Sequence, residues 1–227
     1  MFMKPLVSIL KALPPTKIID ASIDFSKYLP LDLSITNTEL VESKPETSDD
    51  FERFIFGYLA DNNAEVAYGG YIEGRNLYKR STIFKNDSIA ERNIHIGLDL
   101  WAKAGTAVLA PLDGKVHSFQ NNEGLGDYGP TIILEHEAEN EKFYTLYGHL
   151  SLESIENLTV GTIFKKGSKI ATLGNSTVNG DYAPHVHFQI IKNMEDKWGD
   201  YPGVCNTNDL NFYIENCPDP NLLLKIT

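Results

Sequence analysis

Residues 94–100 alternate strictly between apolar and polar side chains, in the order Ile-His-Ile-Gly-Leu-Asp-Leu. Strict alternation predicts a half-buried β-strand, because successive side chains point to opposite faces of a sheet. We expect the apolar face to enter a core. The other face presents the imidazole of His95 and the carboxylate of Asp99, four residues apart on the same side of the strand.

Residues 184–190 repeat this pattern, in the order Pro-His-Val-His-Phe-Gln-Ile. His185, His187 and Gln189 share one face of the predicted strand, and apolar side chains occupy the other. Imidazole nitrogens and carboxylate oxygens are ligands that zinc accepts in proteins. Two strands that each offer a pair of metal-capable side chains therefore predict a divalent metal site.

The apolar spacing of an amphipathic helix, with intervals of three and four residues, is clearest in residues 48–62. The apolar positions of this segment are Phe51, Phe54, Ile55, Tyr58 and Leu59. Thr47 or Ser48 can cap its N-terminus, and we expect its apolar stripe to pack against the domain. A shorter helix is expected in residues 4–13, because two consecutive prolines follow and stop it.

After residue 71 the chain changes to short apolar and β-branched segments separated by turns, which favours a mainly β fold. Residues 107–110 and 114–119 are expected to form a hairpin around Asp113-Gly114, a strong turn pair. Further strands are expected at residues 131–136, 142–147, 161–164 and 169–173. No repeat, low-complexity tract or linker divides the chain.

Composition narrows the function classes. The chain has 227 residues with 31 acidic and 20 basic side chains, a formal net charge of −11. This excess of acidic residues disfavours nucleic acid as a binding partner, and it disfavours simple adhesion to an anionic membrane or wall. Both kinds of binding need concentrated Lys and Arg. No stretch approaches the roughly 20 apolar residues of a membrane span, and the first residues lack a signal-peptide pattern, so we expect a cytoplasmic protein. We expect Cys205 and Cys217 to be free thiols.

The candidate metal chemistry involves five side chains. A catalytic zinc site keeps three protein ligands and one water. His95, Asp99 and one member of the His185/His187 pair supply two imidazoles and one carboxylate. The remaining histidine of the pair, together with His149, is then available to move a proton or to stabilise a developing oxyanion.

Other conspicuous residues are not assigned to this site. His117 has no partner nearby in the sequence. His136, between Glu135 and Glu137, is expected at a solvated strand end. Four residues ahead of the 94–100 strand are expected to have surface or buttressing roles rather than to contact substrate: Arg75, Tyr78, Arg80 and Arg92.

Four motifs in this order give the chain a resemblance to the lysostaphin-type (LytM-like) zinc endopeptidases. They are His95-Ile96-Gly97-Leu98-Asp99, Ala110-Pro111-Leu112-Asp113-Gly114-Lys115-Val116, Tyr147-Gly148-His149-Leu150 and Pro184-His185-Val186-His187-Phe188. The resemblance covers roughly residues 92–191. It implies that His95, Asp99 and His187 bind zinc, and that His149 and His185 are the unliganded catalytic pair.

The resemblance also implies a fold and a substrate class. The fold is an antiparallel β-sandwich, here with an N-terminal extension over residues 1–90 that contains one or two helices and packs on a peptidase domain over residues 91–227. Family substrates are Gly- or D-Ala-containing cross-link peptides of the bacterial cell wall. Family members usually act in the periplasm or outside the cell and are often basic, which this chain is not.

Alternatives remain open at this stage. The tail after residue 198 looks like the peptidase domain that is fused to other domains in some larger proteins, which suggests an intracellular peptidase or amidase with a non-wall substrate. A non-catalytic binding or regulatory module on the same fold is a second reading. Two histidines and one carboxylate also form the iron triad of non-haem oxygenases, although their first pair is usually His-x-Asp. The oligomeric state is not indicated.

Overall fold

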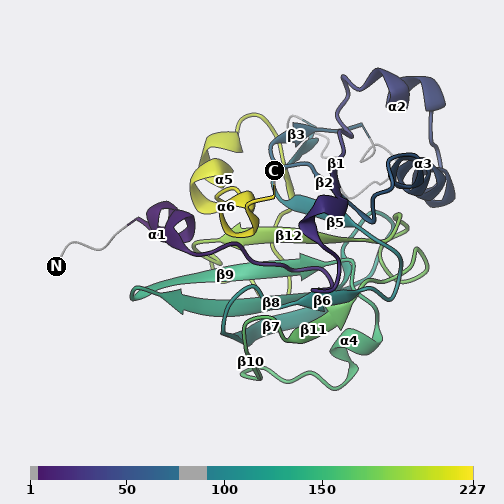
Figure 1. Ribbon diagram of the computed structural model, residues 1–227. Helices are drawn as coiled ribbons and strands as arrows, with labels where there is room; N and C mark the ends of the chain where they lie inside the picture. The colour runs from purple at the N-terminus through teal and green to yellow at the C-terminus, as the bar shows by residue number, and fades with distance from the viewer. Residues whose placement is uncertain (1–4, 77–90, 227) are drawn as a thin grey trace.

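An eight-stranded sheet crosses the molecule in the computed structural model, which describes residues 5–76 and 91–226 (Figure 1). Its strands, in spatial order, are β1 (Tyr28–Pro30), β2 (Val66–Gly69), β5 (Leu98–Trp101), β12 (His185–Ile191), β9 (Glu141–Gly148), β8 (Gly129–Ala138), β7 (Gly114–Asn122) and β10 (Ile163–Phe164). All neighbours are antiparallel except β1 and β2. The predicted mainly β, antiparallel core with helices in the N-terminal extension is confirmed.

Two smaller sheets complete the β structure. One pairs β6 (Ala107–Leu109) with β11 (Lys169–Thr172). The other places β4 (Ile94–His95) between β3 (Glu73–Gly74) and β13 (Val204–Cys205). This second sheet joins the N-terminal extension, the first predicted metal strand and the C-terminal tail.

The expected hairpin around Asp113-Gly114 is wrong. β6 pairs with β11, whereas β7 pairs with β8 and β10, so the two segments belong to different sheets. The Asp113 carboxylate accepts hydrogen bonds from the Lys166 amide and the Lys165 ammonium, both at 2.8 Å. The Asp113-Gly114 pair therefore makes a corner between two sheets, held from the side by residues distant in sequence.

The predicted strand over residues 94–100 is interrupted, and its two halves lie in different sheets. Between them the Ile96 amide donates to the Gly203 carbonyl at 3.0 Å. Gly97 lies at the break, where a β-carbon would come within 2.4 Å of the His187 ring. The imidazole therefore leaves no space at the break for a residue larger than glycine. The strand is also buried on both faces, where a half-buried strand was expected.

The helices flank the sheet, and two of them, the first and the last, pack their leucines into its main core. The helices are α1 (Leu6–Ala12), the 3₁₀ helix η1 (Phe25–Lys27), α2 (Thr38–Ser43), α3 (Ser48–Asp61), α4 (Glu153–Glu156), α5 (Leu210–Asn216) and α6 (Asn221–Leu224). Both helices expected before residue 90 are confirmed, and α2 was not predicted. The Thr47 side chain caps α3 and forms a reciprocal capping box with Asp50, as its Thr-x-x-Asp spacing allows.

Residues before position 90 are built into the sheet as well as packed on it. β2 pairs with β5 in a register that sets Gly69 opposite Asp99 and Ala67 opposite Trp101. A separate apolar cluster lies here, in which Leu33, Ile55 and Leu59 of the extension pack with Trp101 and Ala183. The extension therefore pairs with and packs against β5, the strand that carries Asp99.

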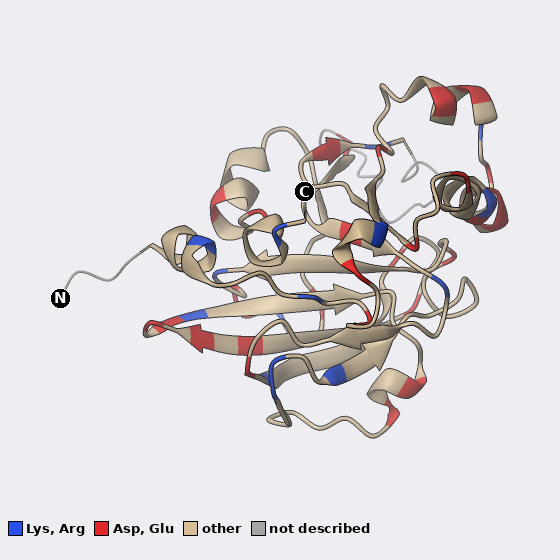
Figure 2. Ribbon diagram, in the orientation of Figure 1, with Lys and Arg blue, Asp and Glu red and all other residues tan. Residues whose placement is uncertain are grey.

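The main core takes the apolar face of the sheet. Leu98, Leu100, Val186 and Phe188 pack there, as the alternation predicts. Cys205 and Cys217 are both buried free thiols, which confirms that expectation. In the view of Figure 2, acidic side chains are spread over α2, α3, α4 and β8. Among the described residues, no helix combines the length and apolarity needed to span a bilayer.

Candidate metal centre

Three side chains from separate strands converge at one point. His95 comes from β4, Asp99 from β5 and His187 from β12, and each is at most 2% exposed. His95 Nε2 lies 2.8 Å from His187 Nδ1, and each of these nitrogens lies 3.2 Å from Asp99 Oδ1. Each residue thus contributes one ligand atom to a group that fits within 4.8 Å. The antiparallel register, which sets His187 opposite Asp99, brings two of them together.

The outer hydrogen bonds fix the tautomers of both rings. His95 Nδ1 lies 2.8 Å from the Gly70 carbonyl oxygen, which only accepts, so Nδ1 carries the proton. His187 Nε2 lies 2.9 Å from Gln189 Oε1. The Gln189 amide is oriented by its own donation to the Pro202 carbonyl at 3.1 Å. Because His187 Nε2 donates to Gln189, Nδ1 is left with a lone pair.

Three lone pairs therefore face one another without a proton among them. Asp99 Oδ1 has no hydrogen-bond partner although it is buried. A buried acceptor without a partner is costly, and three at hydrogen-bond distance repel. A tetrahedral zinc site with bonds of about 2.0–2.1 Å separates its ligand atoms by roughly 3.3 Å. The observed 2.8–3.2 Å spacing and the donor set of two imidazoles and one carboxylate fit such a cation.

Arg75 holds the metal-facing carboxylate in place. Its Nη1 donates to Asp99 Oδ2 at 2.6 Å, and it also pairs with Glu73. Burial alone raises the pKa of Asp99, but the interactions with His95, with the Arg75 guanidinium and with His187 outweigh it and hold this pKa well below its usual range. Because Oδ2 is occupied by the guanidinium, Oδ1 is the oxygen that faces the imidazoles.

This position confirms the buttressing role expected for Arg75. Arg92 also serves the local structure, since its guanidinium donates twice to the Val204 carbonyl, at 3.0 and 2.8 Å. Tyr78 and Arg80 lie outside the described residues.

His149 and His185 form a second pair beside the metal group. Their ring centroids lie 4.1 Å apart, and His185 Nε2 is 4.0 Å from Asp99 Oδ1. His149 Nδ1 lies 2.8 Å from the Asn179 carbonyl, and His185 Nδ1 lies 2.7 Å from the Ala183 carbonyl. Each ring therefore keeps its proton on Nδ1 and a lone pair on Nε2. Burial lowers the pKa of both rings, so both are neutral at pH 7.

The backbone of His149 is strained into place. Its φ is 63°, in the left-handed region that residues other than glycine rarely adopt. Two contacts hold it there: its amide donates to the Tyr128 carbonyl at 2.7 Å, and its carbonyl accepts from the Gly174 amide at 3.0 Å. The ring position is thus set by two loops rather than by regular strand geometry.

Aromatic side chains frame both histidine pairs, and the sequence analysis did not assign them. Tyr128 places its hydroxyl 3.4 Å from His187 Nε2. Trp101 stacks on His185 with ring centroids 5.7 Å apart, and Tyr182 meets His149 edge-on at 5.0 Å. Trp101 continues the odd-numbered face of the 94–100 pattern, so an extended reading of the alternation finds it. Tyr128 and Tyr182 lie in loops without periodicity.

A cavity of about 200 Å³ opens onto these groups. All five predicted site residues line it, together with Tyr128 and two carboxyl groups, Asp127 and Asp200. Three apolar side chains of the N-terminal extension also line it: Leu33, Phe51 and Ile55. The structure therefore brings together every residue that the sequence analysis assigned to the site.

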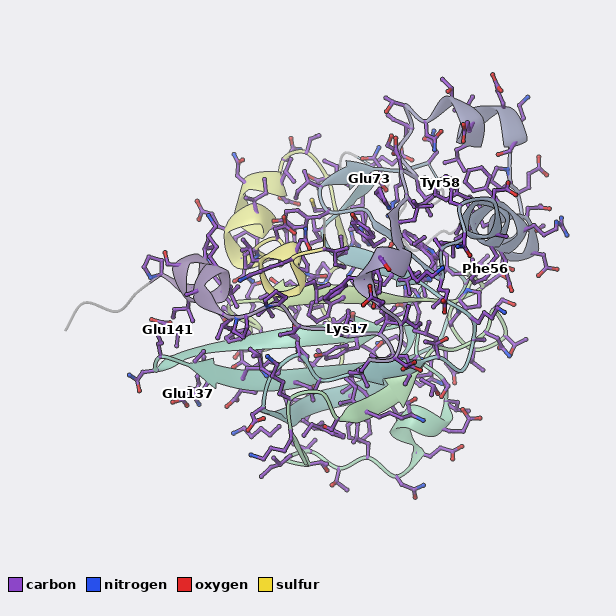
Figure 3. The ribbon with its side chains drawn as sticks, in the orientation of Figure 1. Lys17, Phe56, Tyr58, Glu73, Glu137 and Glu141 are labelled. Carbon is purple, nitrogen blue, oxygen red and sulfur yellow. The ribbon has the colours of Figure 1, made fainter. Side chains whose placement is uncertain are left out.

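The two excluded histidines do lie outside this group, but the environment expected for His136 is wrong. Its side chain is 2% exposed, whereas the expectation was a solvated strand end. Its neighbours in sequence alternate outward, and Glu137 lies with Glu141 at the end of the β8–β9 hairpin (Figure 3). His117 is partly buried and lies against Tyr144 and Trp198.

Comparison with known proteins shows a family match over part of the chain. Residues 93–197 match the sequence profile of Peptidase family M23. A similar protein is an uncharacterized metalloprotease of Haemophilus influenzae, 34% identical over 95 residues. That match covers 42% of this chain but 18% of the relative, so the chain corresponds to less than a fifth of the relative's length.

Solved structures similar to this chain include two peptidases. The catalytic domain of the antimicrobial peptidase lysostaphin from Staphylococcus simulans is 26% identical, over 67% of this chain and 93% of that domain, with a TM-score of 0.38. A zinc-containing peptidase from Vibrio cholerae is also 26% identical, over 54% of this chain and 33% of the other, with a TM-score of 0.36.

Proposed function

Because residues 93–197 match peptidase family M23, we propose that the protein is a zinc endopeptidase that hydrolyses short Gly- or D-Ala-containing peptides. Cross-link peptides of the bacterial cell wall are the first candidate substrate. The observation that carries the proposal is the convergence of three unprotonated ligand atoms on one point, beside two further neutral imidazoles. The substrate class follows the motif resemblance to lysostaphin-type peptidases.

His95, Asp99 and His187 are the residues that would hold the ion. Zinc with such ligands lowers the pKa of a bound water to about 7 and polarises a substrate carbonyl. Gly70 and Gln189 keep the two imidazoles in the tautomers that expose a lone pair inward. Such outer partners orient the ligands and raise their basicity.

His149 and His185 are the residues that would move the proton. Both are neutral and keep Nδ1–H bound to a backbone carbonyl, so Nε2 is the atom that accepts a proton. Once protonated, Nε2 can donate a hydrogen bond to a developing oxyanion or return the proton to the leaving amine. Tyr182 and Trp101 hold the two rings edge-on and face-on, which fixes their orientation.

The experiment begins with protein stripped of metal. Zinc binding is measured by calorimetry, and hydrolysis of pentaglycine and of cross-link peptides ending in D-Ala is followed by mass spectrometry. We expect stoichiometric zinc and zinc-dependent cleavage at a bond that involves glycine or D-alanine. Tight zinc without turnover of any peptide contradicts the proposal and favours a binding module. Cleavage confined to peptides without glycine and D-alanine contradicts the substrate class.

A further inference from the structure

One wall of the cavity comes from the N-terminal extension. Leu33 follows β1, and Phe51 and Ile55 lie one helical turn apart on α3. These three apolar side chains line the same cavity as His149 and His185. The extension thus contributes directly to the wall of the cavity, although it lies outside the segment that matches the peptidase family.

This wall is anchored rather than loosely apposed. Ile55 is 1% exposed and Leu33 is 3% exposed, and both pack with Trp101 and Ala183 in one cluster. Ser48, the first residue of α3, hydrogen-bonds through its hydroxyl to the Asp181 carboxylate in the loop that precedes β12. The wall is therefore fixed to β5 and to the loop that leads into the strand carrying His185.

The wall is continuous with the candidate acid–base pair. Trp101, which packs against the extension, stacks directly on His185. Phe51 is partly buried, so part of its ring remains exposed at the cavity. A glycine in the substrate would leave this apolar surface facing water, whereas an apolar side chain would cover it.

We propose that Phe51, Leu33 and Ile55 form an apolar subsite that selects an apolar substrate side chain next to the scissile bond. This inference rests on the proposed peptidase function and names one feature of its substrate. The specificity determinant then lies in the extension, whereas the reacting groups lie in the 93–197 segment. Phe51 is the residue to change, because Leu33 and Ile55 are almost fully buried and also support the fold.

The experiment compares two glycine-containing peptides that differ only in the residue beside the cleaved bond, Leu in one and Gly in the other. For the wild type we expect kcat/KM to be at least about tenfold higher for the Leu peptide, since one apolar group in a matching pocket discriminates by that factor or more. Phe51→Ser is expected to reduce this ratio to near one while cleavage of the Gly peptide persists. Phe51→Leu is expected to give an intermediate ratio.

Phe54→Ser is the matched control. Phe54 lies on the same helix, is also partly buried and packs against the same cluster, but it lines a different hollow with Tyr58 and Leu31. We expect the wild-type ratio in this variant. A ratio that falls equally in both variants, or a wild type that cleaves the two peptides equally well, contradicts the subsite.

The two proposals fail in different ways. Absence of cleavage of either peptide contradicts the peptidase function. In that case the subsite is tested by calorimetric binding of the two peptides to wild type and Phe51→Ser. Equal affinity of the wild type for both peptides would then also contradict the apolar subsite.

Discussion

Two buried histidine sites lie on the eight-stranded sheet, one of them where it meets the small β3–β4–β13 sheet, and they differ in how their nitrogens are satisfied. His95 and His187 meet Asp99 at the junction of β4, β5 and β12. His136 lies on β8 toward the β8–β9 hairpin, opposite Phe143 of β9. The exposed fraction is 2% for all three histidines. Burial alone therefore does not distinguish a metal site from a structural histidine.

The hydrogen bonds do distinguish them. His136 Nδ1 lies 2.9 Å from the Asp113 carbonyl, and Nε2 lies 2.7 Å from the Thr145 hydroxyl, which lies 2.9 Å from the Tyr147 hydroxyl. Every nitrogen there has a partner within the protein. At the metal group two imidazole lone pairs and a carboxylate oxygen face one another instead. A cation would satisfy the lone pairs of the His95, Asp99 and His187 group, whereas the nitrogens of His136 offer a cation no free lone pair.

The largest effect is expected from removing one of the three metal ligands. Asp99→Ala or His95→Ala is expected to abolish zinc binding and peptide cleavage together, because only two ligand atoms remain. Metal content after dialysis and hydrolysis of a glycine peptide measure the two losses. His136→Asn is the control: both nitrogens of His136 already have hydrogen-bond partners in the protein, so this variant should bind zinc as the wild type does. A ligand variant that retains stoichiometric zinc would contradict the assignment.

His149→Ala should separate chemistry from metal binding. Zinc is expected to bind as in the wild type, whereas kcat should fall by about 10²–10⁴-fold, the usual contribution of a positioned acid–base group. Metal content and single-turnover rates give the two readouts. If the variant is isolated without metal, His149 is a ligand and the roles must be reassigned.

The alternation of polar and apolar residues predicted the site well because it is a local property of strands. Asp99, His185 and His187 lie on the faces that the pattern assigns, and antiparallel pairing of β5 with β12 brings them together. His95 joins them from β4, on the other side of the break at Gly97. The residue types alone offered His149 as an available imidazole, and the motif resemblance gave it the role of an unliganded catalytic residue. Its left-handed backbone has no periodic signature.

What the sequence did not predict depends on contacts between distant segments. The requirement for glycine at the break, Gly97, follows from the His187 ring, 90 residues further along the chain. His136 donates a hydrogen bond to the Asp113 carbonyl at the corner, and the hairpin expected there fails because β6 pairs with β11, more than 50 residues further along the chain. The apolar wall of the cavity requires α3 to dock beside Trp101, which no local pattern indicates.

The burial of His136 should make the free energy of unfolding depend on pH. Burial lowers the pKa of His136 to about 4, against 6.5 for an ordinary histidine. Between these values the unfolded chain binds a proton that the folded protein does not, so stability falls as the pH falls from 6.5 to 4. Over this range the linked loss is about 3 kcal/mol, and below pH 4 it stops growing.

His136→Asn tests this linkage, because asparagine can keep a donor for the Asp113 carbonyl but does not titrate. Urea unfolding of metal-free wild type and variant is measured from pH 4 to pH 7. We expect the wild type to lose more stability than the variant as the pH falls, so that the two curves approach one another. Curves that stay parallel would show that His136 is not the group responsible.

The smallest expected effect concerns the orientation of a ligand rather than its presence. Gln189 is fully buried, and its Oε1 accepts from His187 Nε2 while its amide nitrogen donates to Pro202. Gln189→Met removes the acceptor that fixes the His187 tautomer, so zinc affinity should fall by about 10–100-fold, or about 1.4–2.7 kcal/mol. Gln189→Glu keeps an acceptor and should stay closer to the wild type. Competition with a chelator measures both affinities. Equal affinity of Gln189→Met and wild type would mean that another group, such as the Tyr128 hydroxyl 3.4 Å from Nε2, sets the tautomer.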